Sequence, residues 1–292
     1  MHDFSQLRNL WLGAETKEER VSPEWPKEGV AIEGDFSGIR RFVLRPVPGA
    51  SGAASRLRAR SFRVLALTRV IAGAVEARFH DAAARLFYSA GGRFLIVSGP
   101  CSDWTQRLEQ IQRELDIELL DFYRGELIFH IAGAEFVDGK VPVENLGRAM
   151  GKRKRTPLSG SLQALGLWAD SDRFFSRATK HEKCKGCGVT ATLTPGTEAL
   201  CSTCADDREL GRDLLKSGRV AISKSTTGNI AVLGSRWRFA ATGEIPISSV
   251  ALAPSQAGRI ATFEDLAAQA SGRRYLAYLR IDADRVGEKF RE

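Results

Sequence analysis

The order of apolar and polar patterns between residues 29 and 131 constrains the fold of this chain more than any other feature. A short apolar strand is predicted from Gly29, and residues 55–80 have the wide apolar face of a helix that packs on a sheet. Two β-type runs, 85–90 and 94–98, flank a Gly-Gly turn and predict a hairpin.

A second helix and a fourth strand complete the pattern. The helix is expected to begin near Asp103, where four apolar residues share one face: Trp104, Leu108, Ile111 and Leu115. Residues 127–131 are predicted to form the strand. Strand, helix, hairpin, helix and strand in this order predict a βαββαβ, ferredoxin-like domain of the α+β class. Polymerase and cyclase palms share this fold with many unrelated proteins, so it does not determine function.

The 292 residues are enough for two domains. We expect a lead-in over 1–28, a palm-like domain over 29–150, a helical linker over 151–179, a cysteine module over 180–210, a mixed β/α region over 211–273 and a last segment over 274–292. No apolar run approaches the roughly 18 residues that cross a bilayer, and no secretory signal opens the chain. We therefore expect no membrane association and a cytoplasmic location.

Four of the five cysteines form two CxxC pairs: Cys184 with Cys187, and Cys201 with Cys204. Five cysteines are too few for a disulfide scaffold, and paired CxxC motifs are typical of metal sites. Four thiolates complete a tetrahedral zinc site and leave no open position for catalysis. The spacing predicts one structural zinc ion, and four reduced cysteines without metal are the alternative.

The stretch 36–75 is rich in arginine and contains no Asp or Glu. Within it Arg56, Arg60 and Arg63 share one helix face. Arginine presents a planar fork that suits phosphate, and phosphate contacts dominate nucleic-acid affinity. Together with the net charge of +8, this pattern predicts RNA binding. The alternative is a solvated helix face that forms salt bridges with acids elsewhere in the chain.

Two glycine elements are candidates for nucleotide binding. Ser37 and Gly38 follow the first strand, and Gly91 and Gly92 lie in the hairpin turn. These positions lie side by side in a ferredoxin-like sheet, and glycine lets a phosphate or base approach the backbone. We predict that all four residues contact a nucleotide; ordinary turns are the alternative.

Asp282 and Asp284 follow a mostly apolar strand predicted at 275–281, and two carboxylates at a strand end can bind Mg²⁺. A capping loop is the alternative. The His-Asp pairs at 2–3 and 80–81 lack the further ligands of HD hydrolases, so we regard them as incidental.

Three segments together resemble the first palm of the large subunit of type III CRISPR effector complexes, most closely the Csm-type (III-A) version. They are GDFSGI at 34–39, AASRLRARSF at 53–62 and YSAGGRF at 88–94. The cysteine quartet stands where that family has a zinc module between two palms, and LRIDADRVG at 279–287 resembles the opening strand of the second palm.

The resemblance, which covers about residues 29–292, implies an RNA-guided antiviral effector. Members hold guide RNA and convert ATP to cyclic oligoadenylate with Mg²⁺ bound at a GGDD hairpin of the second palm. They also carry an HD nuclease domain. Neither the hairpin nor the HD domain occurs in this sequence.

We therefore expect one wall of an ATP site and no complete catalytic site, which leaves open whether the chain is an enzyme. The expected partners are guide RNA, target RNA, other effector subunits and a separate chain that supplies the second palm. Mg²⁺ and ATP are expected only with that second palm. Two alternatives remain: a zinc-ribbon nucleic-acid-binding protein without an ATP role, and a cyclase-like protein of the diguanylate type, against which the missing hairpin speaks.

Overall fold

The structure is a computed structural model, and it describes only part of the chain. The described residues are 26–45, 52–123, 125–164, 182–188, 190–191, 199–216, 220–224, 226, 230–240, 245–247, 255–256, 259–260 and 268. Residues 1–250 and 251–292 form separate compact units. The second unit contains one short described pairing, between β11 (Ser255–Gln256) and β12 (Arg259–Ile260). All other elements below belong to the first unit.

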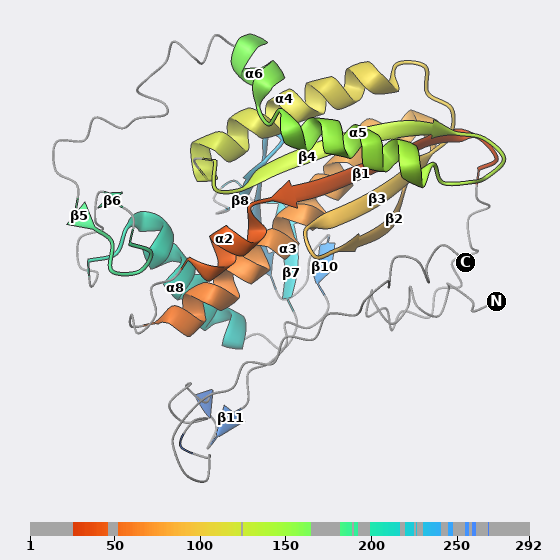
Figure 1. The fold of residues 1–292 in the computed structure, drawn as a ribbon. Helices are drawn as coiled ribbons and strands as arrows, with labels where there is room; N and C mark the ends of the chain where they lie inside the picture. The colour runs from red at the N-terminus through yellow and green to blue at the C-terminus, as the bar shows by residue number, and fades with distance from the viewer. Residues whose placement is uncertain are drawn as a thin grey trace. The chain divides into compact units, whose positions relative to one another are not determined.

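The central sheet has four antiparallel strands in the order β2-β3-β1-β4 (Figure 1). They are β1 (Gly29–Ser37), β2 (Arg85–Ala90), β3 (Arg93–Ser98) and β4 (Ile128–Phe136). This order, with a helix after β1 and another after β3, is the ferredoxin-like arrangement, so the fold prediction is confirmed. The fourth strand extends five residues beyond its predicted end at residue 131, to Phe136.

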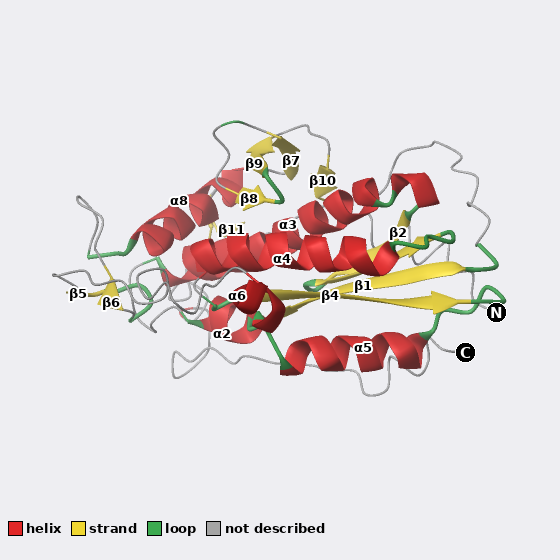
Figure 2. Ribbon diagram, turned by 90° about the horizontal axis from the view of Figure 1, so that it is seen from above, coloured by secondary structure: helices red, strands yellow, loops and turns green. Residues whose placement is uncertain are grey.

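Helices cover both faces of the sheet (Figures 1 and 2). The helices α3 (Ala53–Arg78) and α4 (Trp104–Tyr123) pack on one face, and α5 (Val143–Arg155) packs on the other. The short elements are α2 (Ile39–Leu44), η1 (His80–Ala82) and α6 (Ser159–Ala164). Because α5 runs from 143 to 155, it crosses the domain boundary that we expected at residue 150.

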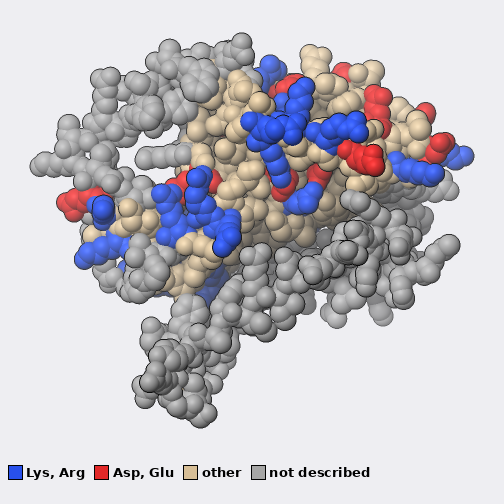
Figure 3. Space-filling view, viewed as in Figure 1, with Lys and Arg blue, Asp and Glu red and all other residues tan. Residues whose placement is uncertain are grey.

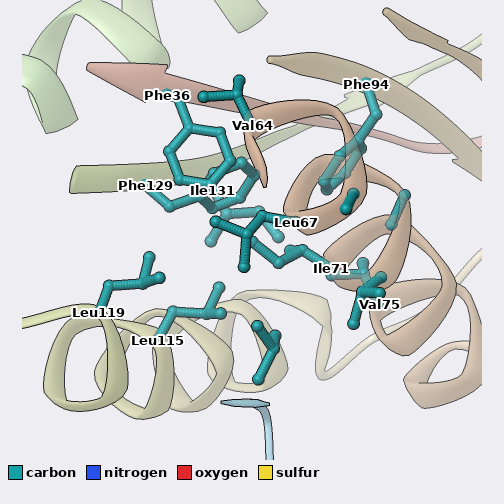
Figure 4. Packing of buried hydrophobic residues seen from close by; sticks show 14 of the residues in the cluster. Phe36, Val64, Leu67, Ile71, Val75, Phe94, Leu115, Leu119, Phe129 and Ile131 are labelled. Atoms are coloured by element: carbon teal, nitrogen blue, oxygen red, sulfur yellow. The ribbon is translucent and has the colours of Figure 1, made fainter. Parts of the chain in front are cut away.

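The alternation of residues along β1 explains how one strand serves two faces. Val30, Ile32 and Phe36 belong to the core that α3 and α4 close, and Ala31 belongs to a smaller cluster that α5 covers. Figure 4 shows the larger core, in which Phe36 and Phe129 lie over apolar side chains of α3 and α4. Burying each such side chain contributes roughly 1.5–3 kcal/mol before the loss of chain entropy is subtracted.

A second antiparallel sheet packs beyond α3 and α4 (Figure 2). Its strands are β7 (Val220–Lys224), β8 (Ile230–Val232), β9 (Ser235–Ala240) and β10 (Ile245–Ile247). Val232 and Trp237 join the main core. Glu118 of α4 accepts hydrogen bonds from the backbone N–H groups of Leu233 and Gly234 and so fixes the β8–β9 turn.

The cysteine region consists of a small hairpin and one helix. The elements are β5 (Glu182–Lys183), β6 (Thr190–Ala191) and α8 (Ser202–Lys216). The strand predicted at 275–281 lies outside the described residues. Among the described helices, none combines the length and the apolar character that crossing a membrane requires.

Candidate functional site

The four cysteines of the two CxxC pairs converge on one point. The Sγ atoms of Cys184, Cys187, Cys201 and Cys204 all lie within 4.8 Å of one another, and those of Cys187 and Cys201 are 3.9 Å apart. A tetrahedral metal with sulfur ligands at about 2.3 Å places the sulfurs about 3.8 Å apart. The cluster therefore has the dimensions to hold one metal ion.

The backbone around Cys184 is shaped for a charged sulfur. The N–H groups of Gly186 and Cys201 donate to its Sγ atom, at 3.3 and 3.2 Å. Gly188 closes the turn with a hydrogen bond to the Cys184 carbonyl oxygen and has a positive φ of 72°. A Cβ atom at Gly186 would lie 2.9 Å from the Sγ atom of Cys204, so glycine is required there. This donor set and its cradle fit a metal ion.

The structure corrects the expected character of the arginine face. Arg56, Arg60 and Arg63 do share one side of α3, but their residues are only 0%, 2% and 6% exposed. The burial argues against direct contact between these side chains and RNA phosphates. Figure 3 shows where Lys and Arg do reach the surface in this view, over α5 and over the region of α2 and α8.

An acid from the cysteine module accounts for the burial of two of these arginines. Asp207 of α8 accepts hydrogen bonds from Nε of Arg60 at 2.8 Å and from Nε of Arg63 at 2.7 Å. The Asp207 side chain is 0% exposed. Of the two interpretations of the arginine pattern, the salt-bridged helix face therefore describes Arg60 and Arg63, with the difference that the pairs are buried.

Helix α8 lies unusually close to the start of α3. A Cβ atom at Gly211 would overlap the carbonyl oxygen of Ser55, so the absence of a side chain allows the approach. Arg58 adds a hydrogen bond of 2.7 Å to the Gly211 carbonyl oxygen. Sequence reasoning missed Asp207; the available signal was an acid three residues after the last CxxC cysteine, on a helix.

The two glycine elements lie side by side, as expected. The Phe36 N–H donates to the Gly92 carbonyl oxygen at 3.0 Å, so the end of β1 meets the β2–β3 turn. Gly92 faces the Ile39 side chain, and Gly38 lies against the Glu126 backbone. A Cβ atom added to either glycine would overlap with that neighbour. Nothing lies within 4 Å of a Cβ position at Gly91, which is exposed. We call this edge, formed by Ser37, Gly38, Gly91 and Gly92, the glycine edge.

Charged side chains on the α5 face of the sheet border the glycine edge. Glu33 and Asp35 of β1 are buried, and each has a basic partner: Arg93 pairs with Glu33, and Lys154 of α5 pairs with Asp35. The Arg93 Nε atom also lies 3.8 Å from Asp35. Both carboxylates are therefore neutralised by cations from this chain.

His130 of β4 is the buried titratable group nearest the glycine edge. Its Nε2 atom lies 3.0 Å from the Ser37 hydroxyl. Burial, together with the charge of Lys154, lowers the pKa of His130 to about 4, although Asp35 opposes the shift. The ring is therefore neutral at physiological pH.

The His-Asp pair at 80–81 is engaged by other groups of this chain. In the pair at 80–81, Asp81 is held by Arg107, which lowers the pKa of Asp81 to about 2, and the Nδ1 atom of His80 lies 3.0 Å from the Ala77 carbonyl oxygen. Asp282 and Asp284, together with the other His-Asp pair at 2–3, lie outside the described residues.

Comparison with known proteins links this geometry to one family. Residues 30–162 match the family model of the Csm1 subunit domain B. The chain is 26% identical, over 305 aligned positions, to the CRISPR system single-strand-specific deoxyribonuclease Cas10/Csm1 (subtype III-A) of Thermococcus onnurineus (strain NA1). The alignment covers 90% of this chain and 38% of that protein, so the chain spans well under half the length of this relative.

Solved structures show the same fold. One is the Csm1–Csm4 subcomplex of the type III-A CRISPR-Csm interference complex, with a TM-score of 0.57, 20% identity and coverage of 91% of this chain and 36% of that one. Another is the Csm1–Csm4 cassette in complex with one ATP, with a TM-score of 0.58, 20% identity and coverage of 92% and 37%. Residues 30–162 are therefore similar to domain B of the Csm1 subunit, and the chain as a whole is similar to part of a Cas10/Csm1 protein of a type III-A CRISPR system.

Proposed function

We propose that this chain forms the first palm of an RNA-guided antiviral effector and supplies one wall of an ATP site. The observation that carries the proposal is the glycine edge, where Ser37 and Gly38 lie next to Gly91 and Gly92, and where the space around Gly91 is free. Backbone without side chains allows a phosphate or base to approach closely. The Csm1–Csm4 cassette that shares this fold was solved with ATP, which supports the assignment.

The charges beside the glycine edge favour a role as one wall of the ATP site and not as a complete active site. Phosphoryl transfer to form cyclic oligoadenylate needs metal ions held by carboxylates. Glu33 and Asp35 are engaged by Arg93 and Lys154, so neither is available to a cation. We propose that Asp282 and Asp284, together with a second palm, provide the Mg²⁺ ligands.

We further propose that the metal held by Cys184, Cys187, Cys201 and Cys204 is zinc. Soft thiolates in a closed tetrahedral set favour this ion, whose function here is structural. A Cys201→Ser variant should lose the metal and the local fold of 180–210, because binding of structural zinc is coupled to folding. Metal analysis of the purified chain should find one zinc per chain, and clearly less than half an equivalent would contradict the assignment.

The proposed partners are other CRISPR effector subunits, guide RNA and target RNA. The relatives of known structure were solved as Csm1–Csm4 subcomplexes, which supports a subunit partner. For RNA we propose exposed basic side chains, such as Lys152 and Arg155 of α5, in place of the buried face of α3. RNA affinity that depends on them should fall with rising salt concentration.

A pair of glycine variants tests the ATP wall. Gly91 and Gly139 both have a positive φ, 60° and 67°, so Gly91→Asp and Gly139→Asp carry similar backbone strain. Gly139 follows the opposite end of β4 from the glycine edge. Measured with a fluorescent ATP analogue at low salt, Gly91→Asp should weaken binding by about 10-fold through repulsion of the phosphates, and Gly139→Asp should not. Equal affinities in the two variants would contradict the proposal.

Incubation of the pure chain with ATP and Mg²⁺ tests the one-wall assignment. Mass spectrometry should detect no cyclic oligoadenylate without a second palm. Robust product that disappears in Asp282→Ala would show a complete metal site within this chain and would overturn the one-wall assignment.

A further inference from the structure

The guanidinium group of Arg60 joins three elements of the molecule. Its Nε atom donates to Asp207 of α8 at 2.8 Å, its Nη1 atom to the Phe42 carbonyl oxygen of α2 at 2.9 Å, and its Nη2 atom to the Sγ atom of Cys204 at 3.4 Å. The ring of Phe42 lies beneath it, 5.2 Å from the guanidinium carbon to the ring centroid. All three nitrogens are thus engaged in the interior of the protein.

The cysteine cluster can add negative charge to this junction. Arg60 and Arg63 share one buried carboxylate, Asp207, in a place where the three side chains are 2%, 8% and 0% exposed. Asp206 adds a weaker attraction to Arg63, and a further anion beside the buried Arg60 would be stabilising. A zinc ion with four thiolates carries a net charge of −2, and Cys204 is in contact with Arg60. Four neutral thiols would supply no such charge.

We propose that Arg60 is a positioning residue that couples metal binding at the cysteine cluster to the docking of α8 on α3 and to the placement of α2. This inference rests on the proposed zinc loading. A hydrogen bond to a thiolate is stronger than one to a neutral sulfur, so the loaded cluster holds Arg60 in its orientation. Partners of this kind also orient metal ligands and raise metal affinity.

The same contacts lead to the glycine edge. Helix α2 begins directly after Gly38, and the Phe42 N–H donates to the Gly38 carbonyl oxygen at 2.9 Å. Arg60 binds the carbonyl oxygen of the same Phe42. Metal at Cys204 should therefore stabilise the helix that flanks the proposed ATP wall.

Two substitutions on α3 separate this coupling from simple packing. Arg60→Met removes the contact with Cys204, whereas Arg58→Met removes a contact with α8 at Gly211 and serves as the matched control. In a zinc competition with a chelator, the full chain carrying Arg60→Met should lose about 10-fold or more in zinc affinity, and the control at most about threefold. Arg60→Lys should be intermediate, because it keeps the charge and loses the planar fork.

Cobalt substitution gives an absorption band whose position general destabilisation of the fold does not change. The N–H···S hydrogen bond stabilises the sulfur lone pairs, so its loss should shift the sulfur-to-cobalt charge-transfer band to longer wavelength in Arg60→Met and leave it in place in Arg58→Met. Unchanged affinity and an unchanged band in Arg60→Met would overturn the coupling while leaving the metal site intact. If the parent chain takes up neither zinc nor cobalt, the proposed zinc site itself has failed.

Hydrogen exchange of the parent chain keeps the test decisive if Arg60→Met does not fold. Removal of zinc with a chelator should increase exchange in α8 and at Phe42 in α2, as well as around the cysteines. An increase confined to 182–204 would show that the cluster folds independently of the palm, and the coupling would then be wrong.

Discussion

Two sides of the palm bury charge in different ways. Where α3 meets α8, Arg60 and Asp207 are both enclosed, with side-chain exposures of 2% and 0%. Where α5 meets the sheet, Asp35 is buried but its partner Lys154 keeps 37% of its side chain exposed. The first pair joins two modules of the chain, and the second closes a sheet face beside the glycine edge.

This difference indicates which basic residues are available to bind an anionic partner. A buried guanidinium that has lost its water needs its carboxylate, so the α3–α8 pair acts as a structural joint. Exposed basic side chains on α5, such as Lys152 and Arg155, keep their water and can bind an anion at a low desolvation cost. We therefore propose that RNA phosphate meets the α5 side of the palm and not the arginine face of α3.

The largest expected effect is loss of the buried acid. Asp207→Ala leaves Arg60 and Arg63 without their carboxylate, and we expect a loss of about 3–5 kcal/mol in unfolding free energy. Glu109→Ala removes the partner of Arg153 on α5, where both side chains are partly exposed, and should cost about 1 kcal/mol or less. Urea unfolding at constant zinc measures both. Equal losses of unfolding free energy in the two variants would contradict the difference between the α3–α8 side and the α5 side.

A smaller effect should appear on the α5 side as the pH falls. The pKa of His130 is about 4 in the folded state against an ordinary 6.5, so the unfolded chain binds more protons between these values. Stability is then complete above pH 6.5 and is lost as the pH falls toward 4, by about 2 kcal/mol at pH 5. Urea unfolding at pH 8 and pH 5 should show this loss in the parent chain.

The variant His130→Gln isolates this contribution, because it cannot take up the proton. Its stability should fall less between pH 8 and pH 5 than that of the parent, by the same 2 kcal/mol or so. Lys154→Met provides a second check, since removal of the neighbouring charge should raise the pKa of His130 and reduce the pH dependence. Identical pH profiles in parent and His130→Gln would show that His130 is not the responsible group.

The smallest expected change in stability comes from adding one methyl group to α8 or to α5 by a glycine-to-alanine substitution. Gly211→Ala in α8 places a Cβ atom against the Ser55 carbonyl oxygen, and the overpacking should outweigh the gain in helix propensity, for a net loss of about 1 kcal/mol. Gly147→Ala in α5 meets nothing within 4 Å and should stabilise by up to about 1 kcal/mol. Thermal unfolding of both variants provides the measurement, and opposite signs are the expected result.

Local patterns in the sequence were sufficient for the palm and for the cysteine set. The hairpin at 85–90 and 93–98 and the long helix at 53–78 match their predictions within two residues, because apolar periodicity and a Gly-Gly turn act over short distances. The cysteine spacing likewise predicted the convergence of four sulfurs, since each CxxC pair forms one turn. The glycine edge followed from the strand order of the predicted fold.

Only the tertiary structure decided which basic residues face the interior. Arg60 and Asp207 are 147 positions apart in the sequence, and no local pattern links an arginine on one helix to an acid on another. Periodicity placed the arginines on one face of α3, but the direction of that face depends on what packs against it. That packing depends on a glycine, Gly211, whose effect appears only when two helices meet. The sequence determined the elements and the metal ligands, and long-range packing determined their charge environment.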